Sequence, residues 1–228
     1  GNQVKKLISV AGIEKIDVVR PYLSIRNAIK HTGEIYFETT SESSVAEIQK
    51  YNDQLDSWER NQGYQIILSD GFAWIQSYER TTLFILRRLL EFSNNGNKGQ
   101  REYNQKFLRE SPLDFADDLK KQAIQDVFVN SRLLLIYGAA GTGKTTLINY
   151  ISNLMSNQRK LFLTKTHTAL QNLKRRIDNP GTDSDFISID IFTKQVKLPD
   201  YDIIFMDECS TIDNRTMERF LNRMSPDS

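Results

Sequence analysis

Two groups of residues have the types and the spacing needed to handle a phosphorylated ligand. The first is Gly138-Ala139-Ala140-Gly141-Thr142-Gly143-Lys144-Thr145, which fits the pattern G-x-x-x-x-G-K-[S/T] throughout. Glycines let successive backbone N–H groups turn inward, and a helix that begins here adds unpaired donors and partial positive charge. We therefore expect this loop to bind the phosphates of ATP.

Three side chains at the end of the loop have separate expected roles. The Lys144 ammonium suits the β- and γ-phosphates, where it would act as a catalytic point charge. The Thr145 hydroxyl suits Mg²⁺, and Thr146 could add a contact to the α-phosphate.

The second group is a pair of carboxylates at the end of an apolar run. Residues 203–206 are Ile-Ile-Phe-Met, and Asp207 and Glu208 follow directly. Beside a phosphate loop, the first acid is expected to hold Mg²⁺ and the second to act as the catalytic base that polarises the attacking water. The alternative is that both acids only cap the next helix.

The elements that must position these groups alternate between strand and helix. Such alternation predicts parallel β-α-β units, an α/β fold with helices on both faces of the sheet and the phosphate loop within it. The carboxylate pair would then lie at the carboxyl edge of the sheet, beside the loop. The expected strands are residues 133–137 (buried), 160–164, 186–189 and 203–206, and the expected helices are 147–154, 169–177, 213–223 and one starting at Ser111-Pro112-Leu113-Asp114.

Residues 1–100 predict a smaller mixed α/β region whose role the sequence does not reveal. Short strands are expected at residues 34–37 and 64–68, a polar helix at 44–60 and an amphipathic helix from Phe72 onward. Residues 94–100 have the composition of a linker, so the ATPase domain is expected to span 101–228. Trp58 and Trp74 could stack on bases, although burial in the core is the better interpretation of large aromatics.

Composition excludes several other classes of protein. The chain has 228 residues, a net charge of +1 and a single cysteine, so intramolecular disulfides and thiolate zinc sites are excluded and Cys209 is interpreted as a small packing residue. The apolar runs are too short to span a bilayer. A cytoplasmic protein without a membrane partner is expected.

Three segments resemble the first RecA-like domain of a superfamily 1 helicase, closest to the RecD-type subgroups. Residues 133–146 resemble motif I, 163–173 resemble motif Ia, and 206–214 resemble motif II. The resemblance implies single-stranded DNA or RNA as partner. It also implies nucleic-acid contacts from Thr164, Thr166, His167 and Thr193, and an adenine-reading glutamine at Gln122, with Gln125 still possible.

The resemblance covers only part of a helicase, and another class of ATPase remains an alternative. The family's G-D-x-x-Q motif and second RecA-like domain do not occur before Ser228, so the chain by itself is expected to be weakly active or inactive. The rival is a P-loop ATPase of another branch, such as an AAA-type remodeller or a defence NTPase that acts on proteins. The basic segment 159–177 contains no acid; it either neutralises nucleic-acid phosphates or forms a solvated helix face.

Overall fold

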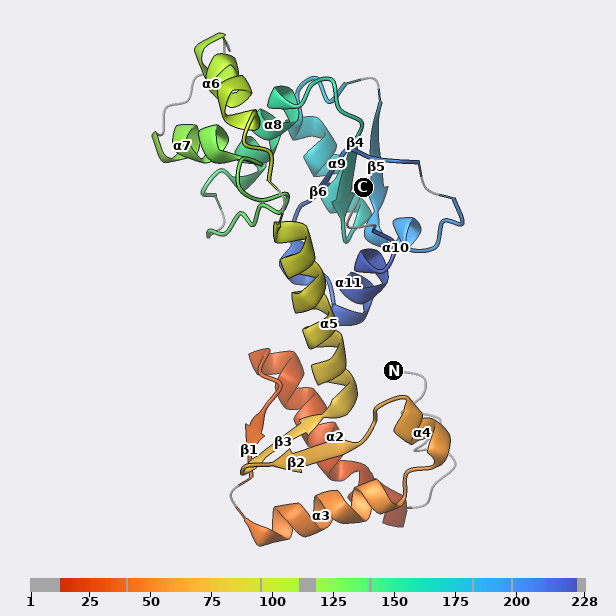
Figure 1. Ribbon diagram of the computed structural model, residues 1–228. Coiled ribbons are helices and arrows are strands. Elements are labelled where there is room, and N and C mark those ends of the chain that lie inside the picture. Colours follow the sequence, from red (N-terminus) through yellow and green to blue (C-terminus); the bar gives the residue numbers. More distant parts are fainter. Residues whose placement is uncertain are drawn as a thin grey trace. The chain divides into compact units, whose positions relative to one another are not determined.

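The computed structural model describes residues 13–39, 41–94, 96–110, 118–139, 141–181, 183–197 and 199–224. The chain divides into two compact units, residues 1–83 and 84–228 (Figure 1). The division falls inside helix α5 (Gln76–Ser93), and the segment interpreted as a linker therefore lies within the second unit. Three sequence-based expectations, Ala140, the helix start at 111–114 and part of the linker, lie outside the described residues.

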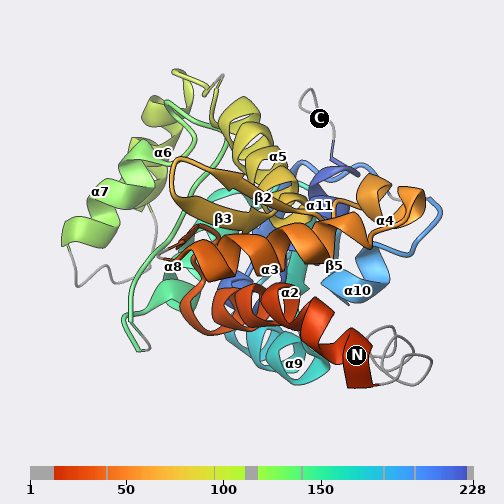
Figure 2. The ribbon, with the colours of Figure 1, turned by 90° about the horizontal axis from the view of Figure 1, so that it is seen from below.

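The first unit is a small antiparallel sheet with helices on one face. Its strands are β1 (Phe37–Glu38), β2 (Ile66–Ser69) and β3 (Phe72–Ile75), in the order β1-β3-β2. Helices α2 (Ile13–Thr32) and α3 (Glu42–Asp53) pack on the sheet (Figures 1 and 2). The buried core residues are Val18, Ile25, Ile48, Tyr51, Ile66, Ala73 and Ile75.

Two predictions in this unit were wrong. The helix expected from Phe72 begins only at Gln76, because Asp70 and Gly71 adopt positive φ values of 51° and 79° and turn the chain into a hairpin between β2 and β3. The helix expected at 44–60 is two helices, α3 and α4 (Ser57–Asn61), because the Asp56 side chain accepts from Glu59 N and starts a new one.

The second unit contains the parallel sheet that the alternation predicted. Its strands are β4 (Lys160–Thr164), β5 (Ser184–Ser188) and β6 (Ile203–Met206), in the order β5-β4-β6. Helices cover both faces (Figure 1): α8 (Lys144–Leu154) and α9 (His167–Arg176) on one, α10 (Ile189–Phe192) and α11 (Asn214–Leu221) on the other. The remaining helices are α6 (Gln100–Glu110), α7 (Asp118–Asp126) and the 3₁₀ turn η1 (Cys209–Thr211).

Side-chain alternation along β4 divides the interior of this unit into two cores. Leu161 and Leu163 join the core under α10 and α11, whereas Phe162 joins the core under α8 and α9. The Phe162 ring stacks on Phe186 of β5 at 4.4 Å and on Phe205 of β6 at 4.9 Å between centroids. These three rings occupy register-paired positions, so one aromatic row crosses the whole sheet.

The expected buried strand at residues 133–137 is a further correction. This segment belongs to neither sheet, and Leu135 and Tyr137 are exposed. The Ser131 hydroxyl donates to Leu133 O (2.8 Å) and accepts from Leu133 N (3.0 Å). A local side chain thus satisfies backbone groups that a strand would give to a neighbour, a known form of competition with sheet formation.

Candidate active site

The phosphate loop depends on glycine at its two left-handed positions. Gly141 has φ 81° and Gly143 has φ 83°, values that other residues rarely adopt, and Gly143 is the N-cap of α8. Space is also restricted at Gly138, where a Cβ atom would lie 2.7 Å from Thr142 Oγ1. The motif residues therefore have the conformations that the sequence pattern requires, with Ala140 outside the described part.

Lys144 bonds to the loop itself. Its Nζ donates to Gly138 O and to Ala139 O, both at 2.8 Å. These carbonyls hold the ammonium over the loop, where a phosphate oxygen would replace them as acceptor. Two backbone carbonyls of the loop thus fix the position of the Lys144 ammonium.

The two motifs meet through Thr145 and Asp207. Thr145 Oγ1 donates to Asp207 Oδ2 at 3.3 Å, across 62 positions of sequence. Asp207 is placed by the sheet, because its N–H donates to Leu163 O (3.0 Å) at the end of β4. The loop and the carboxylate strand thus form one site at the carboxyl edge of the sheet.

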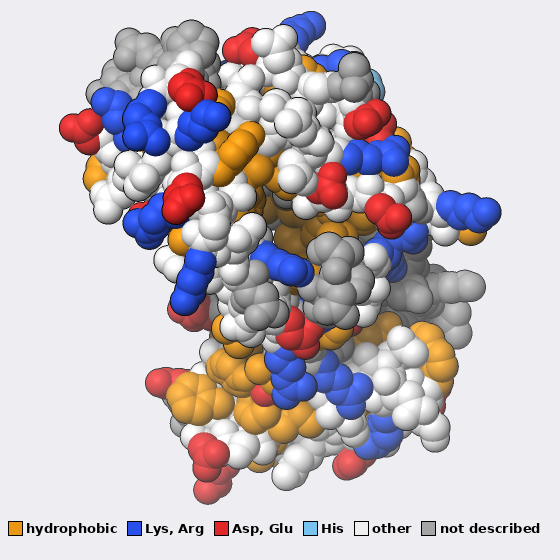
Figure 3. Space-filling view, turned by 45° about the horizontal axis from the view of Figure 1, so that its top comes forward, with side chains coloured by type: hydrophobic (Ala, Val, Ile, Leu, Met, Phe, Trp, Pro, Cys, Tyr) orange, Lys and Arg blue, Asp and Glu red, His pale blue; other side chains and the backbone are white. Residues whose placement is uncertain are grey.

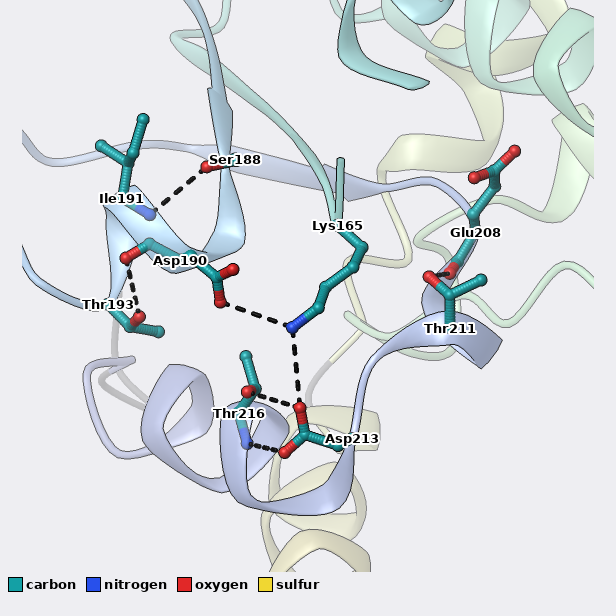
Figure 4. Close-up of polar contacts among 9 residues, drawn as sticks. All are labelled: Lys165, Ser188, Asp190, Ile191, Thr193, Glu208, Thr211, Asp213 and Thr216. Atoms are coloured by element: carbon teal, nitrogen blue, oxygen red, sulfur yellow. Dashed lines mark hydrogen bonds and ion pairs between the residues drawn. The ribbon is translucent and has the colours of Figure 1, made fainter. Parts of the chain in front are cut away.

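Glu208 has an unusual backbone. Its φ of 55° lies in the left-handed region, which is sparsely populated by residues other than glycine and costs about 1–3 kcal/mol. The conformation is held by Glu208 N donating to Asp207 Oδ1 (3.0 Å) and by Glu208 O accepting from Thr211 N (3.0 Å) and Thr211 Oγ1 (2.8 Å). The exposed carboxylate points away from Thr211 (Figure 4). Strain of this kind is common where a catalytic side chain must be aimed.

The donor set fits Mg²⁺. A hydroxyl and a carboxylate oxygen lie together at Thr145 and Asp207, and Mg²⁺ prefers hard oxygen ligands while keeping several water or phosphate oxygens of its own. Among the described residues there is no group of three or more His, Cys, Asp or Glu that could form a full protein cage for a metal. The residues therefore suit an ion that arrives with a nucleotide.

A cavity of about 630 Å³ opens beside the loop, within the size range of ligand sites. Sequence reasoning missed part of its lining. Asn149 and Tyr150 follow Thr146 by three and four positions on α8, a helical spacing that could have identified them. Arg176 and Asp178 are brought in by tertiary packing, with Asn149 Nδ2 donating to Asp178 Oδ2 (3.1 Å). The described lining residues are Gly141, Gly143, Lys144, Thr145, Thr146, Asn149, Tyr150, Arg176 and Asp178.

Neither glutamine proposed for adenine is among these described lining residues. Gln122 is exposed on α7, and the backbone carbonyl of Gln125 accepts from Asn104 Nδ2 (3.1 Å). Another α7 residue is closer to the loop: a Cβ on Gly143 would lie 3.0 Å from Lys120 Nζ. The structure thus brings α7 to the loop but does not bring either glutamine into the cavity.

Lys165 connects three segments at the carboxyl edge of the sheet (Figure 4). Its Nζ lies 3.4 Å from Asp190 Oδ1 at the start of α10 and 3.6 Å from Asp213 Oδ2, which caps α11. Desolvation raises the pKa of the Asp213 carboxyl, but bonds from the Thr216 hydroxyl and N–H, together with the Lys165 charge, lower it overall. Lys165 therefore ties the end of β4 to the segment that follows Glu208.

The residues implicated in nucleic-acid contact have different surroundings. Thr164 is buried and donates to Thr166 O (2.9 Å), so its hydroxyl is used inside the protein. Thr166 and His167 are exposed at the start of α9, where Thr166 Oγ1 accepts from Ala169 N (3.2 Å). Thr193 caps α10 and donates to Asp190 O (3.2 Å). Thr166 and His167 are thus the accessible members of this set, with Thr193 partly buried.

The basic segment is less available than its sequence indicated. Lys160 is fully buried, its Nζ donates to Pro180 O (2.8 Å), and desolvation lowers its pKa. Lys165 is ion-paired, while Lys174, Arg175 and Arg176 lie in the last turn of α9, where they suit the negative end of the helix dipole. Acidic and basic side chains are interspersed on the face shown in Figure 3.

Comparison with known families is consistent with this geometry. A family described as an AAA domain (AAA_19), a P-loop NTPase domain found in UvrD-, Rep- and RecD-like helicases, matches residues 120–228. The match includes both the phosphate loop and the carboxylate strand. The parallel sheet and its flanking helices are consistent with a P-loop NTPase domain over these residues. No curated protein matches the chain.

The parallel sheet between helices confirms the expected α/β class. Within the described ranges, no helix of either unit is long and apolar enough to cross a membrane.

Proposed function

We propose that this chain carries the ATP-hydrolysing motor domain of a DNA or RNA helicase or translocase. The observation that carries the proposal is the Thr145–Asp207 contact at 3.3 Å, because it joins the phosphate loop to the carboxylate strand and leaves Glu208 exposed beside them. The accessible Thr166 and His167 follow β4, the strand next to β6, at the same edge of the sheet.

Each residue of the site then has a definite task. Lys144 exchanges its bonds to Gly138 O and Ala139 O for bonds to the β- and γ-phosphates, while loop N–H groups bind the phosphate oxygens. Thr145 and Asp207 would hold Mg²⁺, which supplies charge neutralisation when bound. The Glu208 carboxylate accepts a proton from water as the water oxygen bonds to the γ-phosphorus and the bond to the β-phosphate oxygen breaks, releasing ADP.

A rival is favoured by one observation: two of the six Lys and Arg residues in segment 159–177 are occupied within the protein. Lys160 is buried and Lys165 is paired with two carboxylates, which reduces the charge available for a nucleic-acid backbone. A P-loop ATPase that remodels proteins, or a defence NTPase, would have no need of that charge.

The effect of polynucleotides on ATP hydrolysis distinguishes the helicase or translocase from the rival. Phosphate release from ATP is measured with the 228-residue chain alone, with poly(dT) and with poly(U), and binding of labelled oligonucleotides is followed by anisotropy at two salt concentrations. A helicase or translocase domain should bind in a salt-sensitive way and hydrolyse ATP faster. ATP hydrolysis that no polynucleotide changes, together with no oligonucleotide binding, would refute the helicase or translocase and favour the rival.

A further inference from the structure

Among the described residues, the helices of the first unit leave one face of the sheet uncovered, and that face is aromatic. Ala73 and Ile75 of β3 point into the core under α2 and α3, so their neighbours Phe72 and Trp74 point to the other face. Phe72 and Tyr36 are 41% and 44% exposed. A hollow of about 360 Å³ lies on this face, lined by Tyr36, Ser69, Asp70, Phe72 and Trp74. Figure 3 also shows hydrophobic side chains gathered on the near face of the first unit.

A carboxylate fixes two of the rings. Glu79 in the first turn of α5 accepts from Tyr36 OH through Oε1 and from Trp74 Nε1 through Oε2, both at 2.8 Å. The Tyr36 and Trp74 rings meet edge to face, with centroids 5.3 Å apart. The bond to Glu79 raises the pKa of the Tyr36 phenol, so the phenol keeps its proton and its role as the donor. One carboxylate therefore holds both rings through two hydrogen bonds.

The charge around the hollow has a single sign. Asp70 lines it, Glu38 lies directly opposite Phe72 in the β1–β3 register, and Glu79 bonds to two of its rings. Residues 32–49 and 61–79, which form the three strands and their flanks, contain no Lys or Arg. None of these three carboxylates takes part in an ion pair with another described residue.

Aromatic faces and carboxylates attract the same kind of ligand. A ring face binds ammonium and guanidinium groups within about 6 Å of its centroid, and ring cages are the known sites for such groups. The same carboxylates repel phosphate, which argues against stacking of nucleic-acid bases on these rings. We propose that this hollow, the aromatic–acidic site, binds a basic segment of a protein partner by seating an arginine or lysine side chain between Tyr36, Phe72 and Trp74.

Fluorescence of Trp74 gives a direct test in the intact chain. The chain contains two tryptophans, so Trp58→Phe leaves Trp74 as the only reporter. In this background a short tryptophan-free peptide of alternating glycine and arginine is titrated, and the matched probe replaces each arginine with glutamine. The arginine peptide should change the Trp74 emission saturably, and more weakly at high salt; the glutamine peptide should leave it unchanged.

Three variants then test whether the arginine peptide binds at the aromatic–acidic site. Phe72→Thr removes a ring and introduces a β-branched residue that suits a strand, and it should weaken binding about two- to fivefold. Asp70→Asn keeps a residue that tolerates the left-handed turn and should weaken binding by a similar factor with less salt dependence. Glu42→Gln, an equal charge change at the exposed start of α3, is the control and should bind like the parent.

The outcomes that would overturn the proposal are distinct. Equal responses to the arginine and glutamine peptides would make the face a non-specific apolar surface. If Glu42→Gln and Asp70→Asn weakened peptide binding equally, the effect would come from the net charge of the chain and not from the hollow. Circular dichroism verifies that each variant is folded, and Asp70→Asn alone decides the matter if Phe72→Thr does not fold. A response to a single-stranded oligonucleotide in place of the basic peptide would also refute the site.

Discussion

Replacement of Lys144 by alanine tests whether the ammonium is preset over the loop. Two opposing changes determine the effect on ATP binding. The variant loses two bonds to phosphate in which both partners are charged, at the upper end of the range for charge-assisted bonds, about 3 kcal/mol each. It also no longer has to release the bonds to Gly138 O and Ala139 O, in which only the ammonium is charged, about 1.5 kcal/mol each. The difference is about 3 kcal/mol, so the Kd for ATP should rise roughly 100-fold.

The assay is a titration with fluorescent mant-ATP in the presence of Mg²⁺. Lys121→Ala is the matched control, since Lys121 is an exposed cation on α7 whose partner is Asp118 (3.3 Å), and it should leave the Kd unchanged. The loop bonds also predict that Lys144→Ala without nucleotide melts a few degrees lower, because about 1 kcal/mol corresponds to about 2–4 °C in a chain of this size. A Kd equal to that of the control would refute the role assigned to Lys144.

Three further predictions concern the carboxylates and their neighbours. Glu208→Gln should retain mant-ATP binding while phosphate release falls about 10²- to 10⁴-fold, as expected when a general base is lost; undiminished release would assign the proton to another group. Lys165→Met should lower the free energy of unfolding in urea by about 1 kcal/mol, since both of its ion pairs are to largely exposed carboxylates, and a double-mutant cycle with Asp213→Asn should show non-additivity. Asp213→Ala should cost about 1 kcal/mol at neutral pH because the α11 cap is lost. The folded-state pKa of Asp213 lies below its usual value, so the charged Asp213 carboxylate stabilises the fold. This stabilisation is complete above about pH 4 and is lost as the pH falls through the folded-state pKa. The difference in urea stability between parent and variant should therefore shrink in acid.

The central strands could be predicted from the sequence because their signal is purely apolar. The runs 160–164 and 203–206 have the bounds that their patterns indicated, with Lys160 as a buried exception within the first. The same reasoning was wrong for residues 133–137, which are as apolar as a buried strand. An apolar run becomes a strand only where a neighbour accepts its backbone bonds, and here Ser131 bonds to Leu133 instead.

Local turn chemistry and long-range pairing account for the other differences. Phe72, Ile75 and Tyr78 recur at a helical interval, yet the Asp70-Gly71 turn places the first two in β3. The phosphate loop and the carboxylate pair were predictable because each is contiguous in sequence. The Lys165 ion pairs were not, because Asp190 and Asp213 lie 25 and 48 positions further along the chain and only the sheet brings them together.

The row of stacked rings Phe186, Phe162 and Phe205 has a consequence for the metal-binding residues. A strand can shift against its neighbour only in whole residues, and a shift of one residue would turn the Phe205 ring to the opposite face of the sheet. It would also carry Asp207 along by about 3.3 Å, as large as its present separation from Thr145. The interior of the sheet thus fixes the separation of Thr145 and Asp207: three phenylalanines outside the described cavity lining determine the distance between the two groups proposed to hold Mg²⁺.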